Sequence, residues 1–252
     1  MTEKLKKANI EDSKLERIAK VMARAGLCSR REAEVWIEQG RVSVNGELLN
    51  TPAFKVSESD EIVVDGKALP QKEKTRLFLF HKPAGFVTTN KDEQNRPTIF
   101  DLFPDEFPRV VTVGRLDMNT EGLLLLTNDG ELSRFLELPK NNITRAYRVR
   151  AHGKITQDKL DELKSRLKYQ GTQYGSIKAN LEKQQGTNVW LSVSLEEGKN
   201  REVRNVMEAL GLSVNRLIRT SYGPFHLGKL EKKAILEVRS HQLKTSIPAF
   251  FK

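Results

Sequence analysis

The first third of the chain places its apolar residues at helical spacing and then alternates apolar with polar positions. The residues spaced three and four apart are Leu15, Ile18, Ala19 and Met22. They predict an amphipathic helix that Gly26 ends. Ser29 and Glu32 have the spacing of a capping box for a second helix, which stops at Gly40. The predicted buried side chains of that helix are Ala33, Trp36 and Ile37.

Short strands and tight turns follow these two helices. Val42 to Val44 lead into Asn45-Gly46, and Ile62 to Val64 lead into Asp65-Gly66. Both dipeptides are strong hairpin signals. Two helices and a few short strands are enough for a small module. The polar, aperiodic segment Pro70 to Lys74 then indicates a linker.

The longest apolar runs surround one short polar loop. Leu77 to Phe80 predicts a buried strand that Lys82-Pro83-Ala84-Gly85 ends, and Asn90 to Pro108 predicts a long surface loop with a short ordered insertion. Val110 to Val113 and Leu123 to Leu126 predict two more buried strands, with Gly-Arg-Leu-Asp between them. Catalytic side chains are commonly found on loops at the edge of a sheet, and the charged residues of this motif are predicted to lie on such a loop. An ordinary turn with a solvated Asp fits the same pattern.

The C-terminal half mixes helical and strand patterns without regular alternation. Helices are predicted after a cap at Asn128 and Glu131, over Thr156 to Leu167, and over Val203 to Leu210. Strands are predicted over Tyr147 to Ala151, Val189 to Leu195 and Val214 to Ile218. The closing segments read as a turn over Arg219 to Pro224 and a tail over His241 to Lys252, while Tyr169 to Gln185 predicts no element. We therefore expect an α+β fold with a mixed, mainly antiparallel sheet flanked by helices.

The charge balance favours a polyanionic partner. The 252 residues include 43 basic and 33 acidic side chains, for a formal net charge of +10. Residues 1–74 are nearly neutral, with 14 basic and 13 acidic groups, so the excess lies in the rest of the chain. Basic side chains that neutralise phosphates release counterions and thereby gain affinity. Excess positive charge is common, however, and does not by itself identify the partner.

Several classes of protein are disfavoured by composition. Cys28 is the single cysteine and the four histidines are scattered, so we expect neither a disulfide framework nor a metal site. No apolar run approaches the roughly 18 residues that span a bilayer, and the N-terminus lacks the apolar core of a signal peptide. We expect a cytoplasmic protein that does not bind a membrane.

Two stretches resemble known families. Gly114-Arg115-Leu116-Asp117 and the run from Thr120 to Gly130 resemble the signature of the RsuA/RluB-type ribosomal RNA pseudouridine synthases. Residues 14–69 are similar to the S4 RNA-binding domain, through Arg17, Gly26 to Arg31 and Gly40 to Gly46. The resemblance implies five segments. They are a tail over 1–13, an S4 domain over 14–69, a linker over 70–76, a synthase catalytic domain over 77–240 and a tail over 241–252.

The synthase resemblance also implies roles in catalysis. Asp117 would be the catalytic carboxylate, and Tyr147 would stack on the flipped uracil. A guanidinium that keeps the carboxylate ionised would come from Arg204, with Arg201 as a rival that contacts phosphate. Two further positions would contact the RNA, Arg115 by filling the space that the flipped base leaves, and Leu217 by packing against the uracil. Core packing is the competing explanation for Tyr147 and Leu217.

The S4 resemblance implies phosphate contacts in the first third. The candidate contacts are Arg17, Ser29, Arg30, Arg31 and Arg41. Backbone N–H groups, the helix dipole and two guanidinium groups would converge where the second helix begins. A solvated basic helix face is the simpler alternative.

Isomerising uridine gains and loses no atom, so the implied reaction needs no cofactor. The resemblance favours the large-subunit branch and therefore 23S rRNA, acted on by a monomer. Three alternatives remain open. They are a small-subunit 16S rRNA synthase, a non-enzymatic S4-domain ribosome-assembly factor, and a glycosidase-like hydrolase with Asp117 and Glu121 as paired carboxylates.

Overall fold

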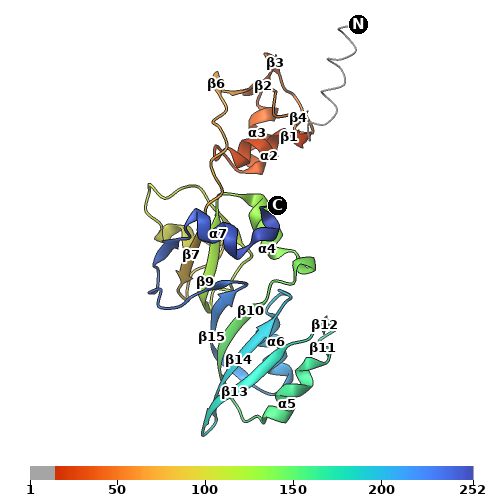
Figure 1. Cartoon of the computed structure of the whole chain (residues 1–252), viewed down its shortest axis with the longest axis vertical. Helices are drawn as coiled ribbons and strands as arrows, with labels where there is room; N and C mark the ends of the chain where they lie inside the picture. The colour runs from red at the N-terminus through yellow and green to blue at the C-terminus, as the bar shows by residue number, and fades with distance from the viewer. Residues whose placement is uncertain (1–14, 252) are drawn as a thin grey trace. The chain divides into compact units, whose positions relative to one another are not determined.

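The computed structural model describes residues 15–251, and the chain divides into two compact units. The first unit ends at Lys74 and the second begins at Thr75. Each unit has its own hydrophobic core residues and is described by itself (Figure 1). The expected N-terminal tail, residues 1–13, lies outside the described residues.

The first unit packs two helices against short antiparallel strands. The helices are α2 (Ile18–Arg24) and α3 (Arg30–Glu38). The strands are β1 (Glu16–Arg17), β2 (Val42–Val44), β3 (Glu47–Leu48), β4 (Lys55–Val56), β5 (Ile62–Val64) and β6 (Lys67–Ala68). Strands β3, β2, β5 and β6 form one sheet in that order, and β1 pairs with β4. The predicted capping box of Ser29 and Glu32 is confirmed.

The first predicted helix starts later than its pattern indicated. Leu15 is 59% exposed and precedes the helix, so its inclusion in the buried stripe was wrong. The reason is that Arg17 is extended and pairs with Lys55, which delays the first helical residue to Ile18. Trp36 is half-buried rather than a core residue.

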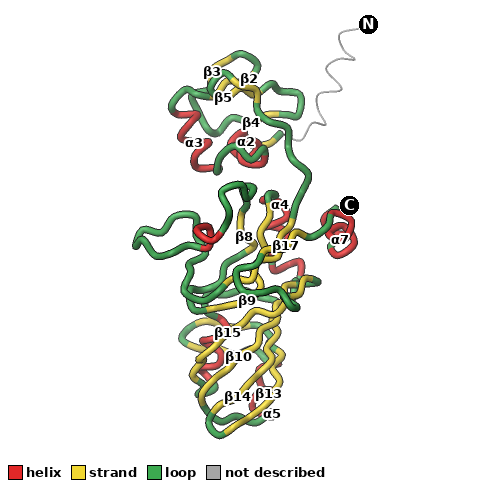
Figure 2. The backbone as a smooth tube through the Cα atoms, turned by 90° about the vertical axis from the view of Figure 1, so that its left-hand side faces the viewer, coloured by secondary structure: helices red, strands yellow, loops and turns green. Residues whose placement is uncertain are grey.

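One long sheet organises the second unit (Figure 2). Its main strand order is β13 (Lys178–Gln185), β14 (Asn188–Leu195), β10 (Arg145–His152), β15 (Ser213–Tyr222), β9 (Thr120–Thr127), β7 (Leu77–Lys82) and β17 (Ile235–Glu237). Strand β8 (Val111–Val113) also pairs with β9, and β16 (Phe225–His226) pairs with β15. Only β9 and β15 pair in parallel among these described strands, which confirms the mixed, mainly antiparallel expectation.

Helices and one small hairpin complete the second unit. The α-helices are α4 (Gly130–Glu137), α5 (Gln157–Asp161), α6 (Glu202–Ala209) and α7 (Ser240–Ser246). Short 3₁₀ turns occupy Ile99–Leu102, Pro139–Asn141, Glu162–Lys164 and Pro248–Phe250. Strands β11 (Leu167–Tyr169) and β12 (Thr172–Tyr174) pair with each other. The 3₁₀ turn at Ile99 confirms the ordered insertion predicted in the long loop.

Strand β9 is buried on both faces, which explains its continuous apolar run. Leu123 and Leu125 belong to a core that helices α4 and α7 contribute to. Leu124 and Leu126 belong to a separate core with aromatic residues of the long loop, including Phe103. The catalytic candidates therefore lie next to a rigid central strand.

Three local predictions in the second unit were wrong, and one segment without a prediction forms strands. Asp129, not Asn128, caps α4, because Asn128 accepts a hydrogen bond from the Arg76 N–H. Helix α5 ends at Asp161 because Leu167 joins β11. The predicted turn at Arg219 is strand, since β15 continues to Tyr222. The segment without a predicted element, Tyr169 to Gln185, contains the end of β11 and the whole of β12 and β13.

The segment expected to be a C-terminal tail is a packed helix. Helix α7 and the turn after it contribute Leu243 and Ile247 to the core, with Phe250 and Phe251 packed against it. The Phe250 ring lies 5.5 Å from that of Phe135 in α4. Chain beyond Arg239 is therefore part of the second unit.

Candidate active site

The loop between β8 and β9 is anchored by a buried lysine. Lys82 is 0% exposed, and its Nζ donates to the main-chain oxygens of Pro83, Asp117, Met118 and Thr120 at 3.0–3.3 Å. Burial lowers the pKa of Lys82 to about 8, while the nearby charges of Asp117 and Glu121 oppose that shift. The sequence indicated that this lysine shapes a turn beside the site. Its contacts fix the loop that carries Asp117.

Two further hydrogen bonds hold the same loop. The Thr88 hydroxyl donates to the Leu116 carbonyl at 2.8 Å. The Gly85 N–H donates to the Met118 carbonyl, also at 2.8 Å. Residues on both sides of Asp117 are thus tied to the Lys-Pro-Ala-Gly turn and to the loop after it. Such support keeps a reactive side chain in one orientation.

Asp117 faces the beginning of α6. Its side chain is 36% exposed, and its Oδ2 lies 3.7 Å from Nη1 of Arg201. Arg201 is the N-cap residue of α6 and has a left-handed backbone with φ 49°. The direct ion pair with Asp117 therefore comes from Arg201.

Arg204 lies beside this pair and makes main-chain contacts. Its Nη2 donates to the Asn119 carbonyl at 2.9 Å, and its Nη1 donates to the Val214 carbonyl at 3.2 Å. Burial is the main factor that lowers the pKa of Arg204; the charge of Arg201 acts in the same direction and that of Asp117 opposes it. Its Nε is buried without a hydrogen-bond partner among the described residues. Both candidate arginines are thus near Asp117, in different roles.

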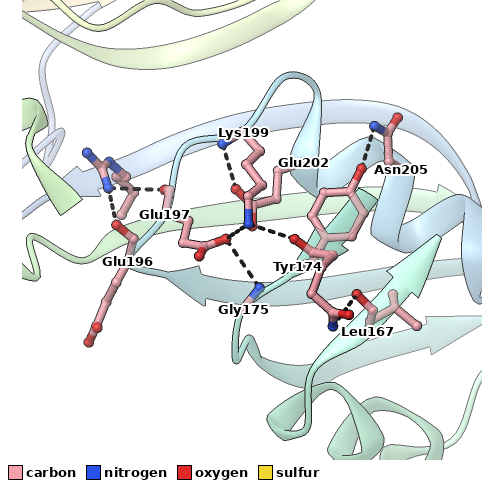
Figure 3. Close-up of polar contacts among 10 residues, drawn as sticks. Leu167, Tyr174, Gly175, Glu196, Glu197, Lys199, Glu202 and Asn205 are labelled. Atoms are coloured by element: carbon pink, nitrogen blue, oxygen red, sulfur yellow. Dashed lines mark hydrogen bonds and ion pairs between the residues drawn. The ribbon is translucent and has the colours of Figure 1, made fainter. Parts of the chain in front are cut away.

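A network that the sequence did not indicate anchors the start of α6 (Figure 3). Lys199 Nζ contacts Glu197 Oε2 at 2.5 Å, and the Lys199 N–H donates to Glu202 Oε2 at 2.8 Å. The Asn205 side chain donates to the Tyr174 hydroxyl at 3.0 Å. Tyr174 belongs to β12, in the stretch that predicted no element, so no sequence signal was available. The network positions both arginines.

An open cleft of about 1100 Å³ joins these groups. Its lining includes Arg115, Asp117, Tyr147, Arg201, Leu217 and Arg219. Leu217 is 4% exposed, and Tyr147 is half-buried beside it in the neighbouring strand. Arg115 is exposed at the loop. The fold thus brings together Asp117, Tyr147, Leu217 and Arg201, which lie up to 100 positions apart in the chain.

Glu121 does not share this cleft. Its carboxylate contacts Nε of Arg216 at 2.7 Å and Nζ of Lys232 at 2.8 Å. The hydrogen bond from Arg216 is the main cause that lowers the pKa of Glu121 to about 2. The paired-carboxylate hydrolase is therefore disfavoured, because one of its two carboxylates is already bound elsewhere.

A family model described as RNA pseudouridylate synthase matches residues 76–209, more than half of the chain. This chain belongs to the RNA pseudouridylate synthase family. A second model, the S4 domain, matches residues 16–62 of the synthase. The matched catalytic segment contains the loop of Asp117, the strand of Tyr147 and the arginines of α6.

Individual proteins agree with this assignment. The synthase is 44% identical to an uncharacterized RNA pseudouridine synthase of Rickettsia felis, over 91% of this chain and 100% of that protein. It is 42% identical to the ribosomal large subunit pseudouridine synthase B of Yersinia pestis, over 85% of this chain and 69% of that protein. A crystal structure of a pseudouridylate synthase matches with a TM-score of 0.64 and 28% identity, covering 90% and 98% of the two chains.

The S4 candidates differ in the solvent exposure of their side chains and in the contacts that those side chains already make. Arg30 and Arg31 are exposed in the first turn of α3, and Arg17 is exposed before α2. The Ser29 hydroxyl accepts the Glu32 N–H within the capping box. These arginines are thus the accessible members of the set.

Arg41 is already engaged within the S4 unit. It binds Asp65 through two hydrogen bonds of 2.9 and 2.5 Å, and its guanidinium lies 4.5 Å from the Trp36 ring centroid. The Asp65 hydrogen bond raises the pKa of Arg41. A phosphate would have to compete with Asp65 for this side chain.

Residues 15–251 contain neither a membrane-spanning helix nor a cluster of metal-binding side chains. No helix there is both long enough and apolar enough to cross a bilayer. No group of three or more histidine, cysteine or acidic side chains there is placed to hold a metal ion.

Proposed function

We propose that this synthase converts a specific uridine of large-subunit ribosomal RNA to pseudouridine, with Asp117 as the catalytic carboxylate. The relatives from Yersinia pestis and Salmonella typhi are both named ribosomal large subunit pseudouridine synthase B, which supports the choice of 23S rRNA. A single chain supplies every proposed cleft residue, so we propose a monomer without a cofactor. We place the reaction in the cytoplasm, with the S4 domain, residues 14–69, docking the RNA.

The observation that carries the proposal is the position of Asp117. Its carboxylate meets a guanidinium at 3.7 Å in a cleft that Tyr147 and Leu217 also line. Arg201 gives the carboxylate a partner of opposite charge. A carboxylate held beside an apolar and aromatic wall suits attack at, or proton removal from, the sugar of a nucleotide seated there.

The proposed reaction breaks the N1–C1′ bond, turns the freed uracil and joins C5 to C1′. Asp117 acts on the sugar, while Tyr147 stacks on the base and Leu217 packs against it. The target must leave its helix to reach the cleft, because stacked bases hide their reacting atoms. Arg115 would fill the vacated space or hold adjacent phosphates. Arg204 would hold the loop through Asn119 and support the charge of Asp117.

The test is pseudouridine mapping on unmodified ribosomal RNA. Wild type should give one new carbodiimide-dependent reverse-transcription stop in 23S rRNA, and Asp117→Asn should give none while binding RNA with nearly unchanged affinity. A matched control is Asp158→Asn, an exposed aspartate on α5, which should keep the stop. Product from Asp117→Asn would remove this residue from the mechanism.

The remaining outcomes distinguish the alternatives. A stop in 16S rRNA alone would replace the large-subunit substrate by the small-subunit one. No stop in either RNA, despite tight RNA binding, would favour an assembly factor that retains the fold without the activity.

A further inference from the structure

Arg219 is a buried cation that lines the cleft and has no acidic partner among residues 15–251. It is 3% exposed, and its Nε donates to the Leu123 carbonyl at 2.7 Å. Its guanidinium lies 5.0 Å from the Tyr222 ring centroid. Nη2 is enclosed and has no hydrogen-bond partner among residues 15–251. Buried donors are nearly always paired, so an unpaired one in a cleft indicates a missing acceptor.

The neighbouring strands place Arg219 where a base would lie. Arg219 is in register with Tyr147 on β10 and with Gly122 on β9, and it lines the same cleft as Tyr147 and Leu217. Side chains in register on adjacent strands share one face of the sheet. Gly122 has no side chain, so none from β9 lies across this position. The stacking residue and the unpaired donor are therefore neighbours.

The missing acceptor is better matched by a base than by a phosphate. Backbone phosphates would meet the exposed arginines, such as Arg115, before they reached a side chain that is 3% exposed. Only a group that enters the cleft reaches Arg219. A flipped uracil enters it in the proposed reaction and carries two carbonyl oxygens as acceptors.

We propose that the Arg219 guanidinium donates a hydrogen bond to a carbonyl oxygen of the flipped uracil and stabilises the uracil anion. This role rests on the proposed isomerisation. When the N1–C1′ bond breaks, its electron pair stays on N1, and the negative charge spreads to both carbonyl oxygens. A fixed, buried cation beside that charge lowers the barrier, because it needs no reorganisation.

The same donor can serve the base before and after it turns. A half-turn about the N3–C6 axis exchanges N1 with C5, and it also exchanges the two carbonyl oxygens. The fixed guanidinium therefore meets an acceptor in both orientations. C5 then bonds to C1′, the C5 proton is lost, and N1 gains a proton, so the product is an isomer. Arg219 remains protonated throughout.

The first measurement compares single-turnover rates at saturating enzyme on an RNA fragment that contains the mapped uridine. Arg219→Met should slow the reaction about 10²- to 10³-fold, the loss typical for one such donor, with RNA affinity nearly unchanged. Arg219→Lys keeps the charge and should lose less. The control Arg148→Met removes an exposed arginine of β10 and should keep the wild-type rate. An undiminished rate in Arg219→Met overturns the proposal.

The second measurement changes the substrate and leaves the protein intact. Fragments carry 2-thiouridine or 4-thiouridine at the target, because sulfur is a weaker hydrogen-bond acceptor than oxygen. The wild type should lose rate on at least one thio substrate, and Arg219→Lys and Arg219→Met should lose severalfold less on it. If the thio substrates slow all three proteins by the same factor, the proposed role of Arg219 is overturned, while the proposed function of the enzyme is not. A wild type that modifies no ribosomal RNA overturns the proposed function and this role with it. Should Arg219→Met fail to fold, the comparison with Arg219→Lys still decides.

Discussion

Gly122 permits the close approach of β9 to β15, the parallel strand pair beside the cleft. Its φ is +107°, and a Cβ there would collide with the backbone of Arg219. We expect Gly122→Ala to destabilise the fold by about 3 kcal/mol or more, because both backbone strain and overpacking are imposed. Thermal unfolding measures this. The control is Gly130→Ala, at an uncrowded position with an ordinary φ, where little change is expected; a similar loss in both variants would contradict the explanation.

Glu121 stabilises the fold through its bound cations, and the effect depends on pH. The pKa of this carboxyl is about 2, compared with 4.5 for an ordinary glutamate. The contribution of Glu121 to the free energy of unfolding is therefore present above pH 4.5 and is lost as the pH falls through about 2. Glu121→Gln should lower the free energy of unfolding by about 1–2 kcal/mol at pH 7, and the difference should narrow below pH 4.5. Denaturant titrations at several pH values test this. A constant difference down to pH 2.5 would contradict it.

Sequence reasoning proposed Asp117 because its motif is contiguous, and it proposed Tyr147 and Leu217 from strand segments that resemble the family. It favoured Arg204 as the guanidinium beside the carboxylate, whereas the direct ion pair comes from Arg201. Arg201 and Arg204 are three residues apart and both begin α6, so spacing alone treats them alike. The left-handed N-cap conformation of Arg201 distinguishes them, and no sequence pattern indicated it.

At the level of elements, α7 stabilises the core of the second unit, where the sequence predicted only a tail. Leu243 is 1% exposed in the core with α4 and β7. Leu243→Ala should cost about 2–4 kcal/mol of stability, the range for truncating a buried leucine. The control His241→Ala removes an exposed side chain of the same helix and should change stability by less than about 0.5 kcal/mol. Chemical denaturation compares the two, and equal effects would show that α7 does not pack as described.

The elements that sequence missed share a physical cause. Helix α7 has seven residues, too few to establish a helical period. Strand β13 lies at the edge of the sheet and exposes most of its side chains, so its pattern is mostly polar. Strands with at least one fully buried face, such as β14 and β9, were predicted correctly. Length and the extent of burial therefore decided which elements could be predicted.

For the whole molecule, the proposed function assigns RNA docking to the first unit and chemistry to the second. Replacing both Arg30 and Arg31 by Ala should weaken RNA binding and reduce the slope of log affinity against log salt by about 1 to 2, because each lost phosphate contact removes about 0.7 to 0.9. The control double variant Lys55→Ala/Lys67→Ala removes the same charge from two other exposed positions of this unit. Binding titrations over a range of salt concentrations compare them. Identical slopes would reject the phosphate contacts.

Because Lys82 holds the loop that carries Asp117, it also affects how the enzyme responds to changes in salt concentration. The four carbonyl oxygens around its Nζ form an oxygen cage of the sort that elsewhere holds a dissolved cation. Here the cation is covalently attached to β7 and shielded from solvent. The geometry around Asp117 therefore rests on a covalently attached cation, whereas the proposed phosphate docking should weaken as salt screens the exposed charges.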